Sequence, residues 1–276
     1  MEYQFELVGK IGSMALIREE DREIDYNIIS RLGADLRPGM IWVTSGATEI
    51  GRLDYIKRTG RELHGDPEQD KTDYSAQGQA ILMQNYRQFI RPEYGVRQIL
   101  VEHTHFNDAE KREHIRQLLI RAAEQKTIPI INYNDPVSDE ENRKMELAAR
   151  RKLGGEVHEC VDNDETAAVI AGLVRAKMLV LMTSTEGIYR ERGNPDSLVR
   201  EVTGRSFAEV EKKVRELQNS CVGASRSGAN GARAKLEYAL SCVKGGTTVV
   251  IGHARHHLRD LAEGCVPCTR IGFTEG

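Results

Sequence analysis

The sequence has few cysteines, no long apolar run and almost no net charge. Its 5 cysteines in 276 residues are too few, and odd in number, for the disulfide framework of a small secreted domain, so we expect reduced thiols. No apolar run approaches the ~20 residues that span a bilayer. The opening stretch MEYQFELVGKIG also lacks the basic, apolar and small-residue order of a signal peptide. We therefore expect a cytoplasmic protein.

Charge is abundant but balanced in sign. Charged residues make up 29% of the chain, yet 39 Lys and Arg nearly cancel 42 Asp and Glu, which leaves a net charge of -3 with neutral histidine. A protein held to nucleic acid or to a membrane mainly by charge needs an excess of one sign. We therefore expect no nucleic acid and no membrane as partner.

Cys265 and Cys268 form a C-x-x-C pair shortly after His253, His256 and His257, so a zinc site is one interpretation. The pair encloses a proline, and a structural zinc site usually shows its ligand spacing more clearly. The alternative is two small buried thiols near a last strand. We favour that alternative and predict no metal ligands.

Short apolar runs alternate with longer segments of helical periodicity along the chain. The runs have the length and branched residues of strands buried on both faces. This alternation predicts a mainly parallel sheet between layers of helices, in a single domain over 1–276. The predicted strands lie at 5–10, 40–46, 96–102, 128–134, 177–183, 247–252 and 269–273, and the predicted helices at 24–37, 74–90, 109–125 and 231–243.

Two stretches interrupt this alternation. Residues 136–160 are strongly charged and contain a Gly-Gly pair, which indicates an excursion from the sheet with one short helix. Residues 190–204 are polar, and we expect a loop. The histidines of EHTHF (102–106) and HARHH (253–257) are explained at least as well by exposed polar loops as by ligation.

Polar and small residues follow several predicted strands. In an open parallel sheet, ligands bind outside the carboxyl ends of the strands. Glycines and hydroxyls beside a lysine offer backbone donors and a fixed cation, which a phosphate group requires, so we predict phosphoryl transfer. The strand ends are GKIGS with Lys10, Gly12 and Ser13; TSGA with Thr44, Ser45, Gly46 and Ala47; NYND with Asn132, Asn134 and Asp135; and TSTEG, which begins at Thr183.

A second glycine-rich segment, SRSGANGARAKLEYA (225–239), places Gly228 and Gly231 before a helix that carries Lys235 in its first turns. Two lysines and two such turns suit the negative charge of a transferring phosphoryl group. The plainer interpretations are a strand-end lysine at Lys10 and a flexible loop before an amphipathic helix. The absence of G-x-x-x-x-G-K-[ST], and of a G-x-G-x-x-G that opens a helix, excludes an ordinary P-loop enzyme.

The stretch VDNDETAAVIAGLV (161–174) has the pattern of a helix start followed by an apolar helix. We expect Asn163 or Asp164 to cap the free amides, and Glu165 to favour the positive end of the helix dipole. The stretch has more polar groups than one cap requires, so Asn163 and Asp164 are also candidate site residues.

The chain resembles the amino acid kinase family, and within it the glutamate 5-kinase branch, through motifs in the same order. These motifs are VGKIGS (8–13), VTSGATEIGR (43–52), AQGQAILMQNY (76–86), IPIINYNDPV (128–137), DNDETAA (162–168), LVLMTSTEGIY (179–189) and GANGARAKLEYA (228–239). The resemblance implies a three-layer αβα sandwich. It also implies phosphorylation of the γ-carboxylate of glutamate by ATP with Mg²⁺, the first step of proline synthesis, without a covalent enzyme intermediate.

The resemblance also implies roles for individual residues. Lys10 and Lys235 would contact the phosphates, and Asp164, with Asp162, would organise the lysines or the metal. Catalysis would rest on positioning and charge neutralisation. The implied acceptor residues are Ser45, Gly46, Asp135 and Asn163, and the implied nucleotide residues are Gly12, Ser13, Thr183, Ser184, Gly228, Asn230 and Gly231.

The chain departs from the family pattern in several places. Thr183-Ser184 stands where the family has Thr-Asp, so one carboxylate is missing. GANG (228–231) replaces Gly-Thr-Gly-Gly, and 136–160 is longer than the family segment there. We expect no C-terminal RNA-modification-type domain, and the family habit implies a homodimer or homotetramer.

Three functions fit these residues. The first is a glutamate 5-kinase, and the second is a kinase of the same fold with another small carboxylate or phosphate acceptor, which the long 136–160 segment would favour. The third is a nucleotide- or effector-binding relative without turnover, suggested by Ser184 and Asn230.

Overall fold

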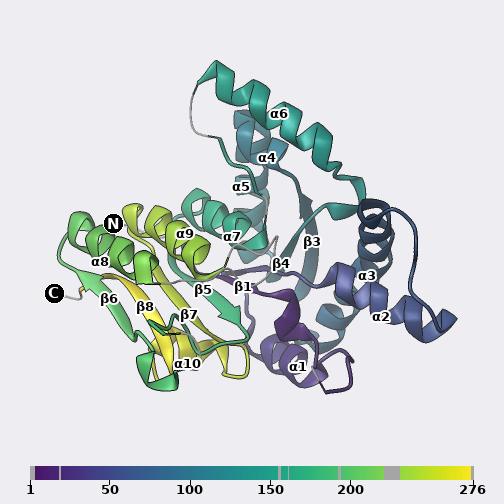
Figure 1. Ribbon diagram of the computed structural model, residues 1–276, viewed down its shortest axis with the longest axis horizontal. Helices are drawn as coiled ribbons and strands as arrows, with labels where there is room; N and C mark the ends of the chain where they lie inside the picture. Colours follow the sequence, from purple (N-terminus) through teal and green to yellow (C-terminus); the bar gives the residue numbers. More distant parts are fainter. Residues whose placement is uncertain are drawn as a thin grey trace. The chain divides into compact units, whose positions relative to one another are not determined.

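The computed structural model describes residues 4–18, 20–154, 157–160, 162–191, 194–220 and 231–274. These residues belong to two compact units, whose helices and strands are labelled in Figure 1. Unit 1 comprises residues 1–11 and 167–276, and unit 2 comprises residues 12–166. Of the predicted nucleotide residues, Gly228 and Asn230 lie outside the described part of the chain.

The strands of unit 1 are mainly parallel and buried. They lie in the order β1 (Phe5–Ile11), β5 (Ala176–Thr183), β7 (Thr248–His253), β8 (Cys268–Phe273) and β6 (Glu201–Gly204). Within this unit β7 and β8 run antiparallel, whereas the other described pairs are parallel. Branched and aliphatic residues fill β5 and β7, and most of their side chains are buried.

The helices of unit 1 connect and cover these strands. α7 (Asn163–Leu173) leads into β5, and α8 (Phe207–Ser220) packs on β6 and α9. α9 (Ala232–Lys244) packs on β7 and β8, and the short α10 (Leu258–Glu263) packs on β5 and β7. α9 precedes β7, which runs parallel to β5, so the helix leads the chain back to the edge where these strands begin. Its N-terminus therefore lies toward the opposite edge, at which β5 and β7 end.

Unit 2 contains three parallel strands in the order β3 (Gly95–Val101), β4 (Thr127–Tyr133) and β2 (Met40–Val43). Every residue of β4 is buried. The helices of this unit are α1 (Tyr26–Asp35), α2 (Ala47–Thr59), α3 (Pro67–Phe89), α4 (His103–Asn107), α5 (Ala109–Glu124) and α6 (Glu140–Leu153), with 3-10 turns at Ser13–Leu16 and Asp135–Val137.

Two glycines let α2 and α3 lie close together. A Cβ on Gly51 would stand 1.8 Å from the carbonyl oxygen of Tyr74, and one on Gly78 would stand 1.8 Å from that of Ala47. Neither position can carry a side chain without moving backbone. The crossing fixes the start of α2, and therefore the turn that contains Ser45, against the middle of α3.

The predicted strands and helices are confirmed to within a few residues, except that α3 begins earlier, at Pro67. The loop expected at 190–204 is wrong in its last residues, because β6 occupies Glu201–Gly204 and pairs with β8. The four residues EVTG of β6 form no apolar run, whereas β2, which is equally short, is the wholly apolar MIWV.

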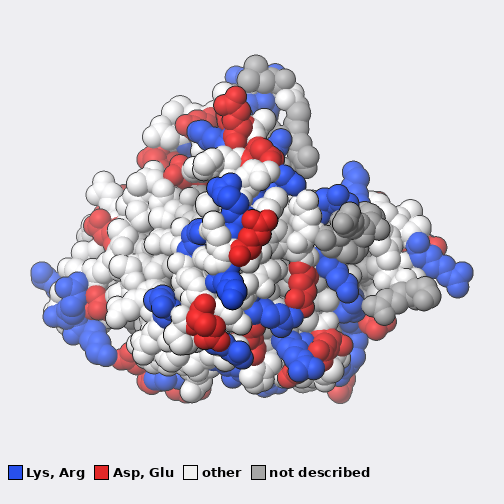
Figure 2. Space-filling model, turned by 180° about the vertical axis from the view of Figure 1, so that it is seen from behind, with Lys and Arg blue, Asp and Glu red and all other residues white. Residues whose placement is uncertain are grey.

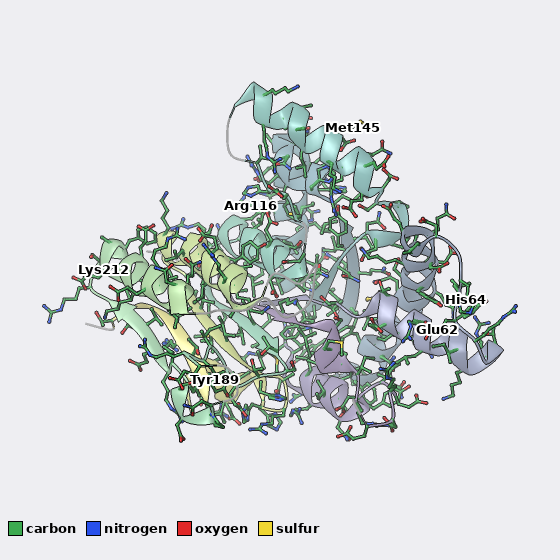
Figure 3. The ribbon with its side chains drawn as sticks, viewed as in Figure 1. Glu62, His64, Arg116, Met145, Tyr189 and Lys212 are labelled. Carbon is green, nitrogen blue, oxygen red and sulfur yellow. The ribbon has the colours of Figure 1, made fainter. Side chains whose placement is uncertain are left out.

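The charged segment 136–160 contains a full helix, α6, of 14 residues. Asp139 caps it by accepting from the Asn142 amide, acidic residues occupy the first turn and basic residues the last, so the charges favour the helix dipole. In Figure 1 α6 runs beside α4. Met145 on this helix, labelled in Figure 3, is 64% exposed.

None of the helices in the described ranges is long and apolar enough to cross a membrane. On the face drawn in Figure 2, Lys and Arg are interspersed with Asp and Glu.

Candidate functional site

A cluster of amide and hydroxyl side chains lies where β2 and β4 end. The Asn163 amide nitrogen donates to Ser45 Oγ at 3.1 Å and to Asn132 Oδ1 at 3.0 Å. The Asn132 amide nitrogen donates in turn to Gln79 Oε1 at 2.8 Å. We call these four residues the amide cluster. It joins β2, β4, α3 and α7, which are distant in sequence.

Two atoms of the amide cluster are buried without a hydrogen-bond partner among the described residues, namely Gln79 Nε2 and Asn163 Oδ1. Asn132 and Gln79 are only 2% and 7% exposed. A buried polar group without a partner costs about 1–3 kcal/mol. A polar ligand that supplied an acceptor to Gln79 and a donor to Asn163 would remove that cost.

The three polar residues at the start of α7 have different roles. Asp162 Oδ1 accepts from the amides of Asp164 and Glu165, both at 2.9 Å, so Asp162 is the cap. The prediction that Asn163 or Asp164 caps the helix is therefore wrong. With the cap one residue earlier, Asn163 stands in the first turn, where its side chain reaches Ser45 and Asn132. Asp164 is 4% exposed.

The turn after β2 brings Ser45 to the start of α2. Gly46 has a φ of 100°, a left-handed conformation that favours glycine, and it precedes the first helical residue. A Cβ there would stand 3.1 Å from Leu16 Cδ1 and 3.8 Å from Ser13 Cα, so the Gly12-Ser13 segment packs on this turn. The first amides of α2 have no partner within the helix and favour an anion beside Ser45.

A buried chain of hydrogen bonds supports the same turn. Trp42 Nε1 donates to the Tyr86 hydroxyl at 3.0 Å, and that hydroxyl lies 2.8 Å from Thr44 Oγ1. Since the indole can only donate, the Tyr86 proton goes to Thr44, whose own proton goes to the Ser45 carbonyl at 3.1 Å. Burial raises the pKa of Tyr86 to about 12.

Charged residues follow β4. Asp135 accepts from Lys71 Nζ on α3 at 3.0 Å, and Asn134 donates to Glu102 Oε1 at 2.9 Å. The Asp135 side chain is 23% exposed and that of Lys71 is 58% exposed. The predicted acceptor residues Ser45 and Asn163 are thus in contact. Asp135 lies three residues after Asn132, the member of the amide cluster on β4.

Some of the predicted phosphate and nucleotide residues lie at one edge of the strands of unit 1. Lys10, 8% exposed, is opposite Leu181 near the end of β1, and Thr183 is opposite His253 at the ends of β5 and β7. Lys235 is in the first turn of α9, after Gly231. By the direction of α9, Lys235 lies toward the edge where β5 and β7 end, which suits an anion.

Ser184 follows Thr183 and is exposed. The carboxylate that the family pattern leads one to expect there is absent, but Glu186 lies two residues further on, with its side chain 13% exposed. Glu186 accepts from His256 Nε2 at 2.7 Å and pairs with Arg255. Tyr189, labelled in Figure 3, follows in the same loop. Sequence reasoning missed Glu186 because its partners lie on the distant β7–α10 connection.

One of the histidines that the sequence led us to place in exposed polar loops is buried. His103 is 4% exposed, and its Nε2 lies 2.8 Å from Glu146 Oε2 on α6, so the exposed-loop interpretation is wrong for His103. Arg150 of α6 also donates to the Asn107 carbonyl at 2.7 Å. Both contacts depend on where α6 packs, which the sequence pattern did not show.

Cys268 is 7% exposed, as predicted, whereas Cys265 is exposed, so the prediction of two buried thiols is wrong for Cys265. Burial raises the pKa of the Cys268 thiol. Among the residues that the structure describes, no three His, Cys, Asp or Glu side chains are grouped to hold a metal ion.

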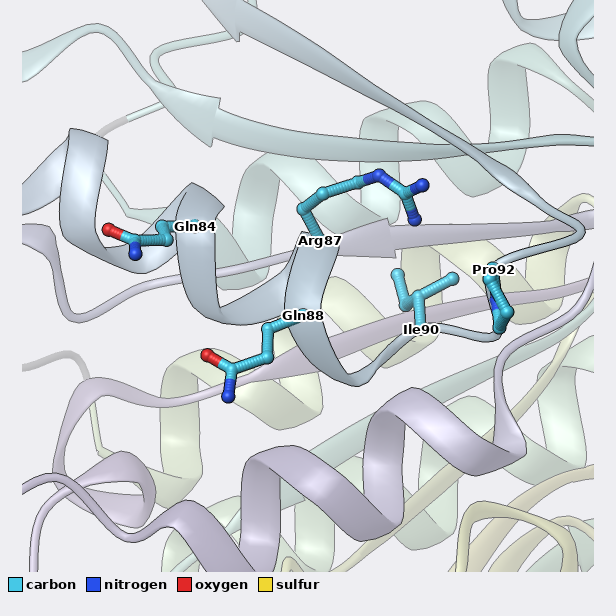
Figure 4. A pocket seen from close by; sticks show the side chains of 5 residues that line it. All are labelled: Gln84, Arg87, Gln88, Ile90 and Pro92. Carbon is cyan, nitrogen blue, oxygen red and sulfur yellow. The ribbon is translucent and has the colours of Figure 1, made fainter.

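A shallow hollow at the far end of α3 is lined by Gln84, Arg87, Gln88, Ile90 and Pro92 (Figure 4). α3 ends where the chain turns into β3, so this hollow lies toward the edge where β3 begins. The amide cluster lies toward the opposite edge, where β2 and β4 end.

Two residues of the candidate site that were not predicted, Gln79 and Lys71, differ in how far the sequence alone could have indicated them. Gln79 lies inside the motif AQGQAILMQNY, where it is one of four amide side chains, so the sequence offers it without distinguishing it from the others. Lys71 is an exposed lysine in a polar helical turn, and only its contact with Asp135 distinguishes it.

A family model described as "Amino acid kinase family" matches residues 7–253. The chain therefore belongs to the amino acid kinase family. It is 30% identical over 254 residues to a glutamate 5-kinase of Streptococcus suis (strain 05ZYH33), covering 89% of this chain and 63% of that relative. It is also 30% identical over 276 residues to a glutamate 5-kinase of Gloeobacter violaceus (strain ATCC 29082 / PCC 7421), covering 97% of this chain and 68% of that relative.

Solved structures agree on the fold. Carbamate kinase from Giardia lamblia bound to AMP-PNP matches with a TM-score of 0.58 and 11% identity, covering 97% of this chain and 98% of that chain. Identity this low shows a shared fold alone. The predicted α/β fold of the amino acid kinase family is confirmed.

Proposed function

We propose that this protein transfers the γ-phosphoryl group of ATP to the γ-carboxylate of L-glutamate, the first step of proline synthesis. The observation that carries the proposal is the amide cluster, which is buried yet leaves a donor on Gln79 and an acceptor on Asn163 without partners. A bound carboxylate offers Gln79 the acceptor that it lacks. Relatives named glutamate 5-kinase, at 30% identity, support this acceptor.

The chemistry asks for positioning and neutralisation rather than for a base, because the acceptor carboxylate is already ionised. Ser45, Asn163 and the first amides of α2 would orient the carboxylate. Lys10 and Lys235 would neutralise the nucleotide phosphates, with Gly231 and Thr183 at the same edge of unit 1. Each lysine acts as a fixed cation on the charge that spreads over the phosphoryl oxygens in the transition state.

Mg²⁺ fits these residues without a full set of protein ligands, because in kinases it binds mainly phosphates and water with one or two carboxylates. Asp164, a buried carboxylate at the start of α7, is the residue that would hold it. When bound, the ion neutralises phosphate charge.

The second candidate function is phosphorylation of another small acceptor. It is favoured by α6, since the Glu140 amide at its start donates to Glu68 of α3 at 2.8 Å, beside Lys71 and Asp135. A helix at this place can change the shape of the acceptor site.

One assay separates the candidates. ADP release from ATP and Mg²⁺ is measured with glutamate, aspartate, N-acetylglutamate, carbamate and nucleoside monophosphates. Turnover with glutamate alone supports the proposal, turnover with a different acceptor supports the second candidate, and ATP binding without turnover indicates a non-catalytic relative. Lys235→Ala should lose most turnover with the fold intact, and Lys10→Ala should lose both rate and ATP affinity. Unchanged activity in either variant contradicts its assigned role.

A further inference from the structure

Lys71 and Asp135 form an ion pair at the end of β4, with Nζ 3.0 Å from Oδ1. Asp135 is the more enclosed partner, at 23% side-chain exposure against 58% for Lys71. An exposed pair of this kind adds little to folding stability, typically 0–1 kcal/mol. Its position beside the proposed acceptor site points instead to a role in ligand binding.

One face of α3 carries both Lys71 and Gln79. The two residues are eight positions apart, with Ser75 halfway between them, so all three follow the i, i+4 spacing of one helical stripe. At 1.5 Å per residue their backbones are about 12 Å apart along the axis. Gln79 contacts Asn132 and Lys71 contacts Asp135, so this stripe runs along the end of β4.

The stripe therefore has two ends of different character. The Gln79 end is uncharged and belongs to the amide cluster, whereas the Lys71 end presents a cation and an anion within hydrogen-bond distance. An acceptor that meets both ends must carry a carboxylate at one end and groups that match a cation and an anion at the other.

An α-amino acid head matches the charged end because one carbon bears both an ammonium and a carboxylate. Its ammonium can pair with Asp135, and its carboxylate can pair with Lys71, whose four-carbon stem lets the charge move. One ion pair is thereby replaced by two. A ligand with a carboxylate alone would instead take Lys71 from Asp135 and leave two anions facing one another.

We propose that Lys71 binds the α-carboxylate of the acceptor, and that its pairing with Asp135 in the empty site makes an α-amino acid head the preferred ligand. The inference rests on the proposed function, since it assigns the far carboxylate to the amide cluster. Lys71 is a specificity residue, because it contacts the acceptor but not the atoms that react.

Two ligands test this role on the whole protein. 4-Aminobutyrate is glutamate without its α-carboxylate, so Lys71 has nothing to bind in it while Asp135 and the amide cluster keep their partners. We would measure kcat and KM for glutamate, and the inhibition constant of 4-aminobutyrate against glutamate, in wild type, Lys71→Met and Lys71→Arg. Lys57→Met is the matched control, because Lys57 is an exposed lysine of α2 that pairs with Glu23 at 3.5 Å.

In Lys71→Met we expect the KM for glutamate to rise about tenfold or more, as for the loss of a hydrogen bond to a charged group. The kcat should stay within about twofold, and the inhibition constant of 4-aminobutyrate should not rise. Lys71→Arg should recover part of the affinity, and Lys57→Met should match wild type.

An unchanged KM for glutamate in Lys71→Met overturns the inference while the proposed function stands. Equal weakening of glutamate and 4-aminobutyrate also overturns it, because that result indicates a structural role. If wild type does not phosphorylate glutamate at all, the proposed function fails and this inference fails with it.

Discussion

The Tyr86 hydroxyl connects a core residue, Trp42, to the turn that carries Ser45, and Tyr86→Phe removes that connection alone. Trp42 is fully buried, so the variant leaves its indole N–H without a partner. A buried donor in that state costs about 1–3 kcal/mol. We therefore expect Tyr86→Phe to lower the free energy of unfolding by that amount at pH 8, measured by urea denaturation.

The same variant makes a prediction about pH. The pKa of Tyr86 is raised to about 12 in the folded protein, against an ordinary value of 10.0. Because the folded value is the higher one, the stabilisation is complete below pH 10 and is lost as pH rises toward 12, since the unfolded chain ionises first. At pH 11 the wild type should have lost about 1.4 kcal/mol through this group, whereas the phenylalanine variant has no such group to ionise.

The gap in stability between wild type and Tyr86→Phe should therefore narrow by about 1.4 kcal/mol between pH 8 and pH 11. Tyr26→Phe is the control, because Tyr26 is 46% exposed and the change should stay within about 0.5 kcal/mol at pH 8. A gap that is the same at both pH values would refute the reasoning about burial. A gap below about 0.5 kcal/mol at pH 8 would refute the reasoning about the hydrogen bond.

Further substitutions test the fold around the site. Gly78→Ala should cost about 3 kcal/mol or more, because its Cβ meets backbone at 1.8 Å; the control Gly172→Ala, which meets nothing within 4 Å, should be neutral or stabilising by up to ~1 kcal/mol in urea unfolding. Glu146→Ala should lower the local stability of α6 by about 1 kcal/mol. Amide hydrogen exchange over 140–153 should then be faster, while exchange in α5 is unchanged. An equal increase in the exchange rate of both helices would contradict this prediction. Asp162→Ala should lower the free energy of unfolding by about 0.5–2 kcal/mol and also raise the KM for the acceptor. Asp162→Ser still caps the helix and should restore both values. A loss of stability without a change in KM would contradict the link between the cap and the acceptor site.

The sequence predicted most of the sheet because most of its strands are continuous apolar runs. β4 is an unbroken buried run of seven residues, and its polar end at Asn132 and Asp135 marks the carboxyl edge. β6, with the residues EVTG, is not an apolar run and was not predicted. α6 was underestimated although its signals were present, since Asp139 and the acidic first turn begin it and Gly154, with a φ of 79°, follows its last residue.

The candidate site was predictable in its residue types and not in its pairings. Ser45 and Asn163 were chosen from two separate motifs, and the structure joins them through a single amide. The Lys71 contact with Asp135, like that of Glu186 with His256, depends on how distant elements pack. No local pattern marks one exposed lysine among several as the partner of a site carboxylate.

The three polar residues at the start of α7 show why a prediction from helix-capping propensity can differ from the packed structure. Any of them can cap a helix by propensity alone, and Asn is as good a cap as Asp. Here the packing decides, because a cap at Asn163 would commit its side chain to the backbone amides of α7 and withdraw it from Ser45 and Asn132. Asp162 as cap satisfies those amides one residue earlier. The placement of Asn163 in the amide cluster is thus a consequence of where the helix starts, and a shift of one residue in that start would remove the amide that bridges Ser45 and Asn132.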